Sequence, residues 1–168
     1  MTTKTTKPRY RVNFDDVPEI VIPPRDPSNK APFRAKKVAG AQASIMLADR
    51  GSGYHTKPHI HDCEQWNYII AGEIWFFVEE HGYRCRKGDI MRIPRNRPHW
   101  AYNRSNDDAV VFECHAPLLV EERSSAKTVW LLDERDDKDA ISTHRNNYID
   151  FSQAEIDEIE ARAFAEED

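Results

Sequence analysis

Residues 53–72 read GYHTKPHIHDCEQWNYIIAG, and residues 88–103 read GDIMRIPRNRPHWAYN. His59 and His61 stand two residues apart in the first stretch, and His99 lies in the second. Alternate residues of a β-strand point to the same face, so a strand here would present both imidazoles to one ion. Imidazole nitrogen is a good ligand for Fe, Zn, Cu and Ni. A single His-x-His pair is often found on a strand without a metal, so the surrounding pattern decides between the two readings.

The chain around these stretches predicts an all-β fold. From about residue 42 to residue 132, short runs rich in Val, Ile, Phe, Trp and Tyr alternate with turn signals such as His81-Gly82. We expect strands near residues 42–48, 54–61, 65–71, 73–79, 83–87, 89–94, 98–103, 109–116 and 127–132. About eight or nine short strands at this spacing are typical of a β-sandwich or a β-barrel.

Both quoted stretches resemble the two sequence motifs of the cupin superfamily, G-x5-H-x-H-x3,4-E-x6-G and G-x5-P-x-G-x2-H-x3-N. Every spacing fits across residues 53–72 and 88–103. The resemblance implies a single cupin-type β-barrel, of the double-stranded β-helix or jelly-roll kind, with a metal inside. Two positions depart from the motifs. Asn96 replaces a glycine, and asparagine tolerates the left-handed backbone that such a turn often needs. Gln65 replaces the glutamate that is the usual fourth ligand.

The resemblance implies His59, His61, Gln65 and His99 as metal ligands, since some cupins with glutamine at this position bind through its side-chain oxygen. The alternative is a three-histidine site in which Gln65 only hydrogen-bonds a bound water. Glu64 would face away from the site on a strand. We expect one divalent transition metal per chain, with Fe2+ favoured and Zn2+, Ni2+, Mn2+ and Cu2+ left open. Three neutral imidazoles and a neutral amide leave the ion its full charge, which favours an anionic ligand such as an enolate, phenolate or carboxylate.

Three further residues are candidates for catalysis. His115 ends a predicted strand near the point where the barrel would close. There it could act as an acid/base or as an extra metal ligand, although a histidine in such a position more often belongs to the core or the surface. Arg92 alternates with Ile93, so it is a candidate to point inward toward an anionic substrate. Tyr102 is one of several aromatic residues in the predicted strands, some of which must line the pocket because small-molecule pockets are largely apolar.

The length of 168 residues suits one domain with tails. We expect a disordered tail over 1–9, an extended N-terminal arm over 10–41, the cupin barrel over 42–132, and a charged linker with a short C-terminal helix over 133–168. Prolines interrupt the arm so often that no helix of normal length fits, although residues 19–22 suit a short strand. Ser152 and Glu155 match a capping box, and apolar residues follow at helical spacing, which predicts a helix over 153–165.

Composition argues against several classes of function. The net charge of −5 and the lack of a helix-turn-helix pattern argue against nucleic acid as a partner. Residues 150–168 hold eight acids and one arginine, a charge of −7, which leaves the rest of the chain at +2. No run approaches the ~18 apolar residues of a membrane span, so we expect no membrane association, and residues 1–10 lack the apolar stretch of a secretory signal. Three cysteines without a Cys-x-x-Cys pair suit a reducing cytosol, so we expect a cytoplasmic protein.

The sequence leaves three functions open. The favoured one is an Fe(II)-dependent dioxygenase that cleaves a C–C bond of a small, anionic diketone, hydroxyketone or phenol, as some similar cupins do. The second is a non-redox metal-dependent isomerase, lyase or cyclase, and the third is a cupin that binds metal and ligand without turnover. Fold does not decide among them. We also expect a homodimer, because cupins commonly pair through N-terminal strands and one sheet face, where Trp75, Phe76 and Trp130 would supply apolar area.

Overall fold

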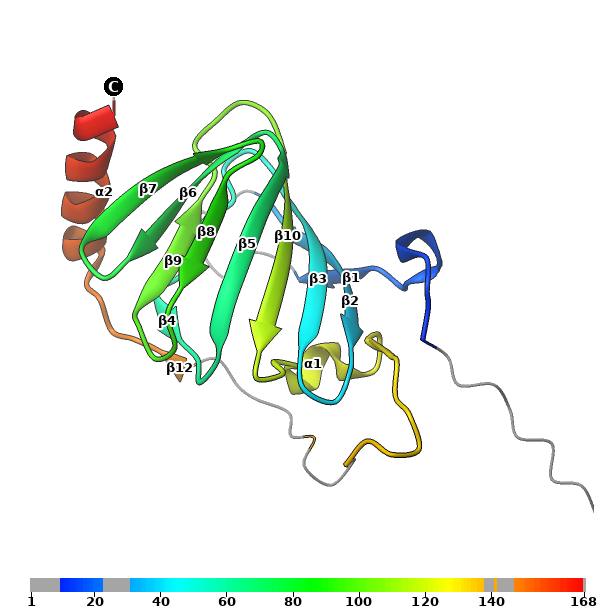
Figure 1. The fold of residues 1–168 in the computed structure, drawn as a ribbon. Coiled ribbons are helices and arrows are strands. Elements are labelled where there is room, and N and C mark those ends of the chain that lie inside the picture. The colour runs from blue at the N-terminus through cyan, green and yellow to red at the C-terminus, as the bar shows by residue number, and fades with distance from the viewer. Residues whose placement is uncertain (1–9, 23–30, 138–140, 142–146, 168) are drawn as a thin grey trace, which may run out of the picture.

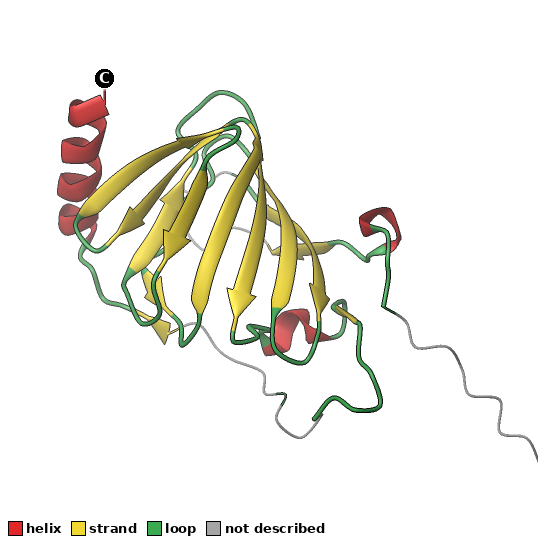
Figure 2. Cartoon of the chain, in the orientation of Figure 1, coloured by secondary structure: helices red, strands yellow, loops and turns green. Residues whose placement is uncertain are grey.

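Two β-sheets face each other around a shared interior, and one long helix lies against the outside (Figures 1 and 2). The computed structural model describes residues 10–22, 31–137, 141 and 147–167. Over these residues the strands form a seven-stranded and a five-stranded sheet, which hydrogen bonds do not join into one closed barrel. This arrangement confirms the predicted all-β, jelly-roll cupin fold.

The larger sheet has the order β1-β2-β3-β10-β5-β8, and β11 pairs in parallel with β2. Its strands are β1 (Ile20–Ile22), β2 (Phe33–Ala39), β3 (Ser44–Arg50), β5 (Glu64–Ala71), β8 (Ile90–Ile93), β10 (Ala109–Ala116) and β11 (Val129–Trp130). β10 lies between β3 and β5 and pairs antiparallel with both. Segments that are remote in the sequence therefore become direct neighbours in this sheet.

The smaller sheet has the order β12-β4-β9-β6-β7. Its strands are β4 (His59–Ile60), β6 (Glu73–Val78), β7 (His81–Arg86), β9 (His99–Tyr102) and β12 (Asn147–Tyr148). The predicted turn at His81-Gly82 instead falls at Glu79-Glu80, where Glu79 adopts a φ of 55° and β7 begins at His81. Asn96 has a φ of 57°, so this asparagine does replace the motif glycine in a left-handed position.

Two segments differ from the sequence prediction. β2 lies inside the region predicted as an extended arm, and it pairs along its whole length with β3. Residues 54–61, predicted as one strand, pair only at His59–Ile60 and at a single bridge from His55 to Tyr102. Pro58 accounts for part of this interruption, because a proline has no N–H to give to a strand ladder.

The helices are α1 (Glu122–Ser125), α2 (Gln153–Glu167) and the 3-10 turn η1 (Phe14–Asp16), and only α2 was predicted. Its capping box is confirmed, since the backbone N–H of Ser152 donates to Glu155 Oε2 at 2.8 Å and the Glu155 N–H donates back to Ser152 Oγ at 3.3 Å. None of the helices described is long and apolar enough to cross a bilayer.

α2 covers the outer face of the smaller sheet (Figure 1). Its apolar residues pack against three aromatic side chains of β6 and β9. The cluster consists of Trp75, Phe77, Trp100, Ile156, Ile159 and Ala163. The helix approaches β7 so closely that a Cβ on Gly82 would lie 2.4 Å from the Cβ of Ala163. Gly82 is therefore required for this packing.

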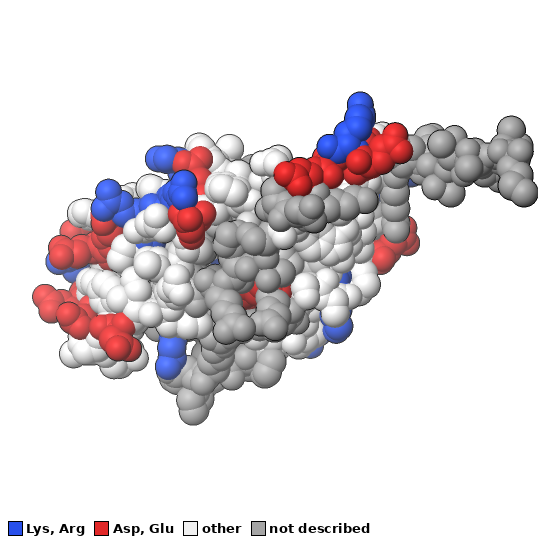
Figure 3. Space-filling model, turned by 90° about the horizontal axis from the view of Figure 1, so that it is seen from below, with Lys and Arg blue, Asp and Glu red and all other residues white. Residues whose placement is uncertain are grey.

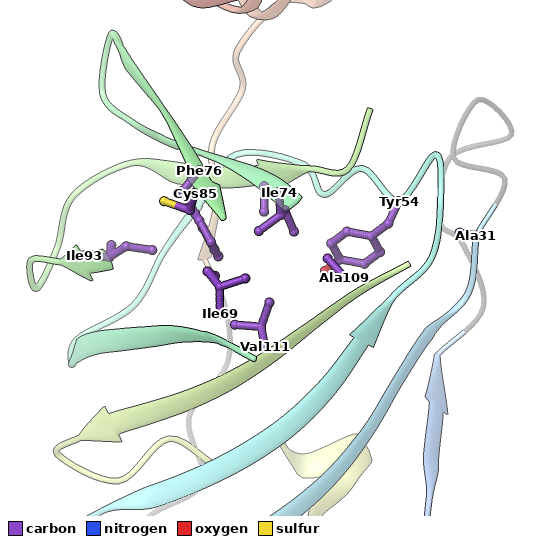
Figure 4. Close-up of a cluster of buried hydrophobic side chains, with 10 residues drawn as sticks. Ala31, Tyr54, Ile69, Ile74, Phe76, Cys85, Ile93, Ala109 and Val111 are labelled. Atoms are coloured by element: carbon purple, nitrogen blue, oxygen red, sulfur yellow. The ribbon is translucent and has the colours of Figure 1, made fainter. Parts of the chain in front are cut away.

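The two ends of the interior differ in chemistry. At one end, which we call the apolar end, buried hydrophobic side chains of both sheets meet (Figure 4). This cluster consists of Ala31, Tyr54, Ile69, Ile74, Phe76, Cys85, Ile93, Ala101, Ala109 and Val111. Burial of this apolar surface is the main stabilising contribution that the interior makes to the fold.

Of the three residues expected to supply apolar area to a dimer, Trp130 is half-buried and the other two are buried. Trp75 and Phe76 are each 1% exposed, so neither offers surface to a partner. In the larger sheet, Val21 of β1 is 44% exposed, and the other large exposed hydrophobic side chains lie on the outer face of β5 and β8. They are Trp66, Tyr68, Ile70 and Ile90, which are 42%, 45%, 38% and 67% exposed.

Candidate metal centre

Three histidines meet at the other end of the interior, near β4, β12 and the start of β5. The pairing of β4 with β9 places His59 directly opposite His99. The His99 ring centroid lies 4.3 Å from that of His59 and 4.6 Å from that of His61, which follows β4. One potential ligand atom from each histidine lies within 4.8 Å of the others. The structure thus brings together the three histidines that the sequence motifs singled out.

Backbone carbonyls fix the orientation of all three rings. Nδ1 of His59 lies 2.9 Å from the Lys57 carbonyl, and Nδ1 of His99 lies 2.9 Å from the Arg97 carbonyl. Nδ1 of His61 lies 3.2 Å from the carbonyl oxygen of Cys63. A carbonyl only accepts, so Nδ1 of His59 and of His99 is the protonated nitrogen, and Nε2 of each keeps its lone pair. This is the usual arrangement of a histidine that binds a metal through Nε2. Nδ1 of His61 also lies 3.1 Å from Cys63 Sγ, so either nitrogen of His61 has a neighbour to which it can donate.

Gln65 completes the group. Its amide nitrogen donates to Asn67 Oδ1 at 2.8 Å and to Glu113 Oε2 at 3.1 Å, so its oxygen is directed at His61 Nε2, 3.1 Å away. With its proton on Nε2, His61 donates to this oxygen; with its proton on Nδ1, the amide oxygen and Nε2 both offer lone pairs to a cation. Nε2 of His99 is buried with no hydrogen-bond partner among the described residues. These four side chains therefore fit a metal ion.

Burial keeps the histidines in the form that binds a metal. It lowers the pKa of His61, and it lowers the pKa of His99 well below the ordinary value, with His59 and His61 adding to the effect on His99. A low pKa leaves the imidazole neutral near pH 7, so its lone pair is available to an ion.

His115 lies beside this group, fully inside the interior. It stands directly across from Gln65 in the pairing of β10 with β5, and its ring centroid is 5.5 Å from that of His61. Its Nε2 is 3.7 Å from Glu113 Oε2, and its buried Nδ1 has no hydrogen-bond partner among the described residues. Burial lowers the pKa of His115 well below the ordinary value. His115 therefore lines the cavity but stands outside the cluster of three histidines.

The prediction for Arg92 is wrong. It pairs with Trp66 across β8 and β5, so its side chain is on the outer face of the sheet. There it is half exposed, and its Nε donates to Glu64 Oε2 at 2.7 Å. Arg92 and Ile93 do point to opposite faces of the sheet, but Ile93 is the residue that points inward, and it is fully buried.

Tyr102 also lies away from the site. Its ring centroid is 4.7 Å from that of His55 and 6.2 Å from that of Phe164 in α2. On β9, His99 and Ala101 point into the interior, so Tyr102 belongs to the opposite face, between the sheet and the helix. Tyr102 does not line the cavity and has no contact with the metal centre among those described above.

Sequence reasoning missed three buried charged residues that line the cavity: Lys37 on β2, Arg50 on β3 and Glu113 on β10. A guanidinium nitrogen of Arg50 forms an ion pair with Glu113 Oε1. For Glu113 the signal was present, because it alternates in phase with Val111 and His115 in a strand whose bounds were predicted correctly. Lys37 gave no such signal, because β2 was not recognised as a strand.

The cavity has a volume of about 160 Å3 and extends from the histidines toward Tyr54 and Phe76. Lys57 and Tyr148 line it at the end where β4 and β12 lie, which is the lower end of Figure 1. Viewed from that end, most described charged side chains lie toward the margins, with uncharged residues over much of the area between them (Figure 3). Pockets for drug-sized ligands usually measure about 300–1,000 Å3, so this cavity suits a smaller molecule.

Comparisons with known proteins agree with this fold. A family model described as a cupin domain matches residues 48–115. The polyketide cyclase RemF from Streptomyces resistomycificus superposes with a TM-score of 0.58 at 15% identity, over 86% of this chain and 88% of that one. An RmlC-like cupin from Shewanella frigidimarina gives a TM-score of 0.53 at 14% identity, over 65% of this chain and 91% of that one. No curated protein sequence matches the chain.

Proposed function

Because the chain belongs to the cupin superfamily and gathers three histidines and a glutamine inside its fold, we propose that it is a metal-dependent enzyme. Its substrate would be a small anionic organic molecule, and oxygen-dependent cleavage of a C–C bond is the favoured reaction. The observation that carries the proposal is the cluster of His59, His61 and His99, whose ligand atoms lie within 4.8 Å of one another and include the buried Nε2 of His99, which has no partner among the described residues.

His59, His61, His99 and Gln65 would hold the ion. Fe2+ is favoured, and when bound it supplies Lewis acidity together with one-electron and O2 chemistry. The protein orients the ligands. Backbone carbonyls hold the imidazoles of His59 and His99, and the amide nitrogen of Gln65 is hydrogen-bonded to Asn67. Since all four groups are neutral, the site keeps its positive charge for an anionic substrate.

The remaining cavity residues support a small anionic substrate. Lys37 is buried and lines the cavity, and its charge contributes to the lowered pKa of His61 and His115, so it acts on the same space. It takes the role that the sequence had given to Arg92. Phe76 and Ile93 supply apolar walls, which exclude water and orient the carbon skeleton.

His115 is the residue we propose for proton transfer. Its ring is buried next to His61, and the lowered pKa keeps it neutral near pH 7, ready to accept a proton. Glu113 Oε2, 3.7 Å from Nε2, is placed to stabilise the imidazolium that results. The same pair favours a second candidate function, a non-redox isomerase, lyase or cyclase, because those reactions need a base beside a polarised carbonyl.

The test compares Fe(II)-loaded with Zn(II)-loaded protein, using pentane-2,4-dione, hydroxyacetone and catechol as probes. For a dioxygenase, O2 consumption in an oxygen electrode should require both Fe(II) and one probe, and His99→Ala should abolish it. Equal conversion by the Zn(II) form without O2 would replace the favoured reaction with the non-redox one. Binding of a probe in calorimetry without conversion by either form would overturn the assignment as an enzyme acting on these substrate classes, in favour of a binding protein.

We also propose that two chains associate through the outer face of β5 and β8. Tyr68 stands opposite Ile90 in this sheet, and Trp66 and Ile70 extend the same apolar strip along β5. This apolar strip ends at the ion pair of Arg92 with Glu64, and it can meet a second copy of itself across a two-fold axis. Light scattering at micromolar concentration should give twice the chain mass, and Ile90→Lys should reduce it to one. A monomeric wild type would overturn this proposal.

A further inference from the structure

The side chain of Gln65 is fixed in one orientation by hydrogen bonds. Its amide nitrogen uses both hydrogens, one toward Asn67 Oδ1 at 2.8 Å and one toward Glu113 Oε2 at 3.1 Å. Glu113 is a carboxylate and therefore accepts only, so the nitrogen and not the oxygen of the amide must face it. The side-chain oxygen of Gln65 is thereby fixed on the side of His61.

Glu113 is held in turn from its other side. Its Oε1 forms a buried ion pair with Arg50, and both side chains are at most 6% exposed. Arg50 is packed between aromatic rings, with its guanidinium carbon 5.0 Å from the ring centroid of Tyr54 and 5.7 Å from that of Phe76. The apolar end of the interior thus fixes Arg50, Arg50 fixes Glu113, and Glu113 fixes Gln65.

We propose that Glu113 is the positioning residue of the metal site, and that it supplies the negative charge which the cupin pattern places on the ligand itself. In this chain the carboxylate of Glu113 does not bind the ion itself. It hydrogen-bonds Gln65, which would bind the ion in its place. The hydrogen bond from the amide nitrogen to a carboxylate polarises the amide. The amide oxygen then carries more negative charge and is a better electron-pair donor to a cation. The inference rests on the proposed metal site at His59, His61 and His99.

This arrangement differs from a glutamate that merely balances Arg50. A counter-ion would affect folding alone, and its effect would not depend on the residue at position 65. A positioning residue acts through Gln65, so its effect on metal affinity should disappear once the Gln65 side chain is removed. Exchanging the amide and the carboxylate between the two positions should also restore the contact, because the carboxylate then at position 65 would accept from the amide then at position 113.

The test measures the Zn2+ dissociation constant by competition with a chromophoric chelator, and the urea midpoint of the metal-free protein. Glu113→Gln should weaken Zn2+ binding about 10- to 100-fold, the range of effects found when an outer partner of a metal ligand is lost. In a Gln65→Ala background the same change should alter affinity less than about threefold. The double exchange Gln65→Glu with Glu113→Gln should return the affinity to the wild-type value or tighter.

Two controls separate the outcomes. Glu121→Gln removes another cavity-lining carboxylate and should change the affinity less than about threefold. If Glu113→Gln does not fold, Asn67→Ala tests the same idea without a change of charge, and it should weaken Zn2+ binding in the same direction. Wild-type affinity in Glu113→Gln, or an equal loss with and without Gln65, would overturn the inference and leave the metal site standing. Absence of Zn2+ binding by the wild type would overturn the proposed function itself.

Discussion

The two ends of the interior are built from the same strands, but one end buries hydrophobic side chains and the other buries polar and ionisable ones. On β5, the inward residue Ile69 belongs to the apolar end, whereas Gln65 and Asn67 belong to the end that holds the histidines, which we call the polar end. On β10, Val111 is at the apolar end and Glu113 at the polar end. A single alternation therefore buries hydrophobic groups in one half of a strand and ionisable groups in the other.

The difference shows which end stabilises the fold and which end is free to do chemistry. Burial of hydrophobic side chains at the apolar end lowers the free energy of folding. At the polar end, burial of imidazoles and of an ion pair costs free energy unless every group finds a partner. Nε2 of His99 and Nδ1 of His115 have none among the described residues. The apolar end must therefore compensate for the polar end when no metal is bound.

The largest expected effect is at the apolar end. Ile69→Ala should lower the free energy of unfolding by about 2–5 kcal/mol, because Ile69 is fully buried and its truncation leaves a cavity. Urea denaturation in chelator measures this loss. The matched control is Ile70→Ala on the outer face of the same strand, which should cost under about 1 kcal/mol. Comparable losses from the two variants would contradict the assignment of stability to the apolar end.

His99→Ala at the polar end should do the reverse. We expect the Zn2+ affinity to fall at least about 100-fold, since one of few strong ligands is lost, while the metal-free protein changes in stability by less than about 1 kcal/mol. Metal content after dialysis and a urea titration give the two quantities. His81→Ala, which alters an exposed histidine of β7, should retain the metal. Full metal occupancy in His99→Ala would exclude the site.

Between pH 8 and pH 5.5, acid should act chiefly on the histidines of the polar end. Burial lowers the pKa of His61, His99 and His115 in the folded state, so the unfolded chain takes up protons first as the pH falls. The metal-free protein should keep its full stability well above pH ~6.5 and lose at most about 1.4 kcal/mol per pH unit for each such histidine below it, and the loss ends at the folded-state pKa of that histidine. Urea midpoints from pH 8 to pH 5.5 test this. Ile69→Ala should show the same slope from a lower starting value.

The smallest effect is expected for His115, at the border of the metal centre. His115→Gln should leave Zn2+ affinity within about threefold of wild type, because its ring lies outside the cluster formed by His59, His61 and His99. It should nevertheless lower turnover of any substrate that requires proton transfer. A large loss of Zn2+ affinity would instead make His115 a ligand, which is the other role that the sequence left open.

The sequence predicted the parts of the site that depend on spacing along one chain segment. The resemblance to the cupin motifs implied His59, His61, Gln65 and His99 as ligands, and the structure brings them together. The charged partners behind them could not be predicted in the same way, because Arg50 and Glu113 meet only after β3 and β10 pair. Arg92 illustrates a different limit: alternation gives two faces, but the identity of the inner face depends on which neighbour is covered by the opposite sheet.

The position of β10 between β3 and β5 has a consequence for the order in which the protein can fold during synthesis. Residues 44–50 and 64–71 leave the ribosome long before residues 109–116. Until then β3 can pair only with β2, and β5 only with β8, and β10 joins these two pairs when it inserts between β3 and β5. Pairings this distant in sequence slow folding and leave strand edges open meanwhile. The contact between Gln65 and Glu113 forms only at that step, so a nascent chain holds the histidine motif before it holds the residue that orients its glutamine.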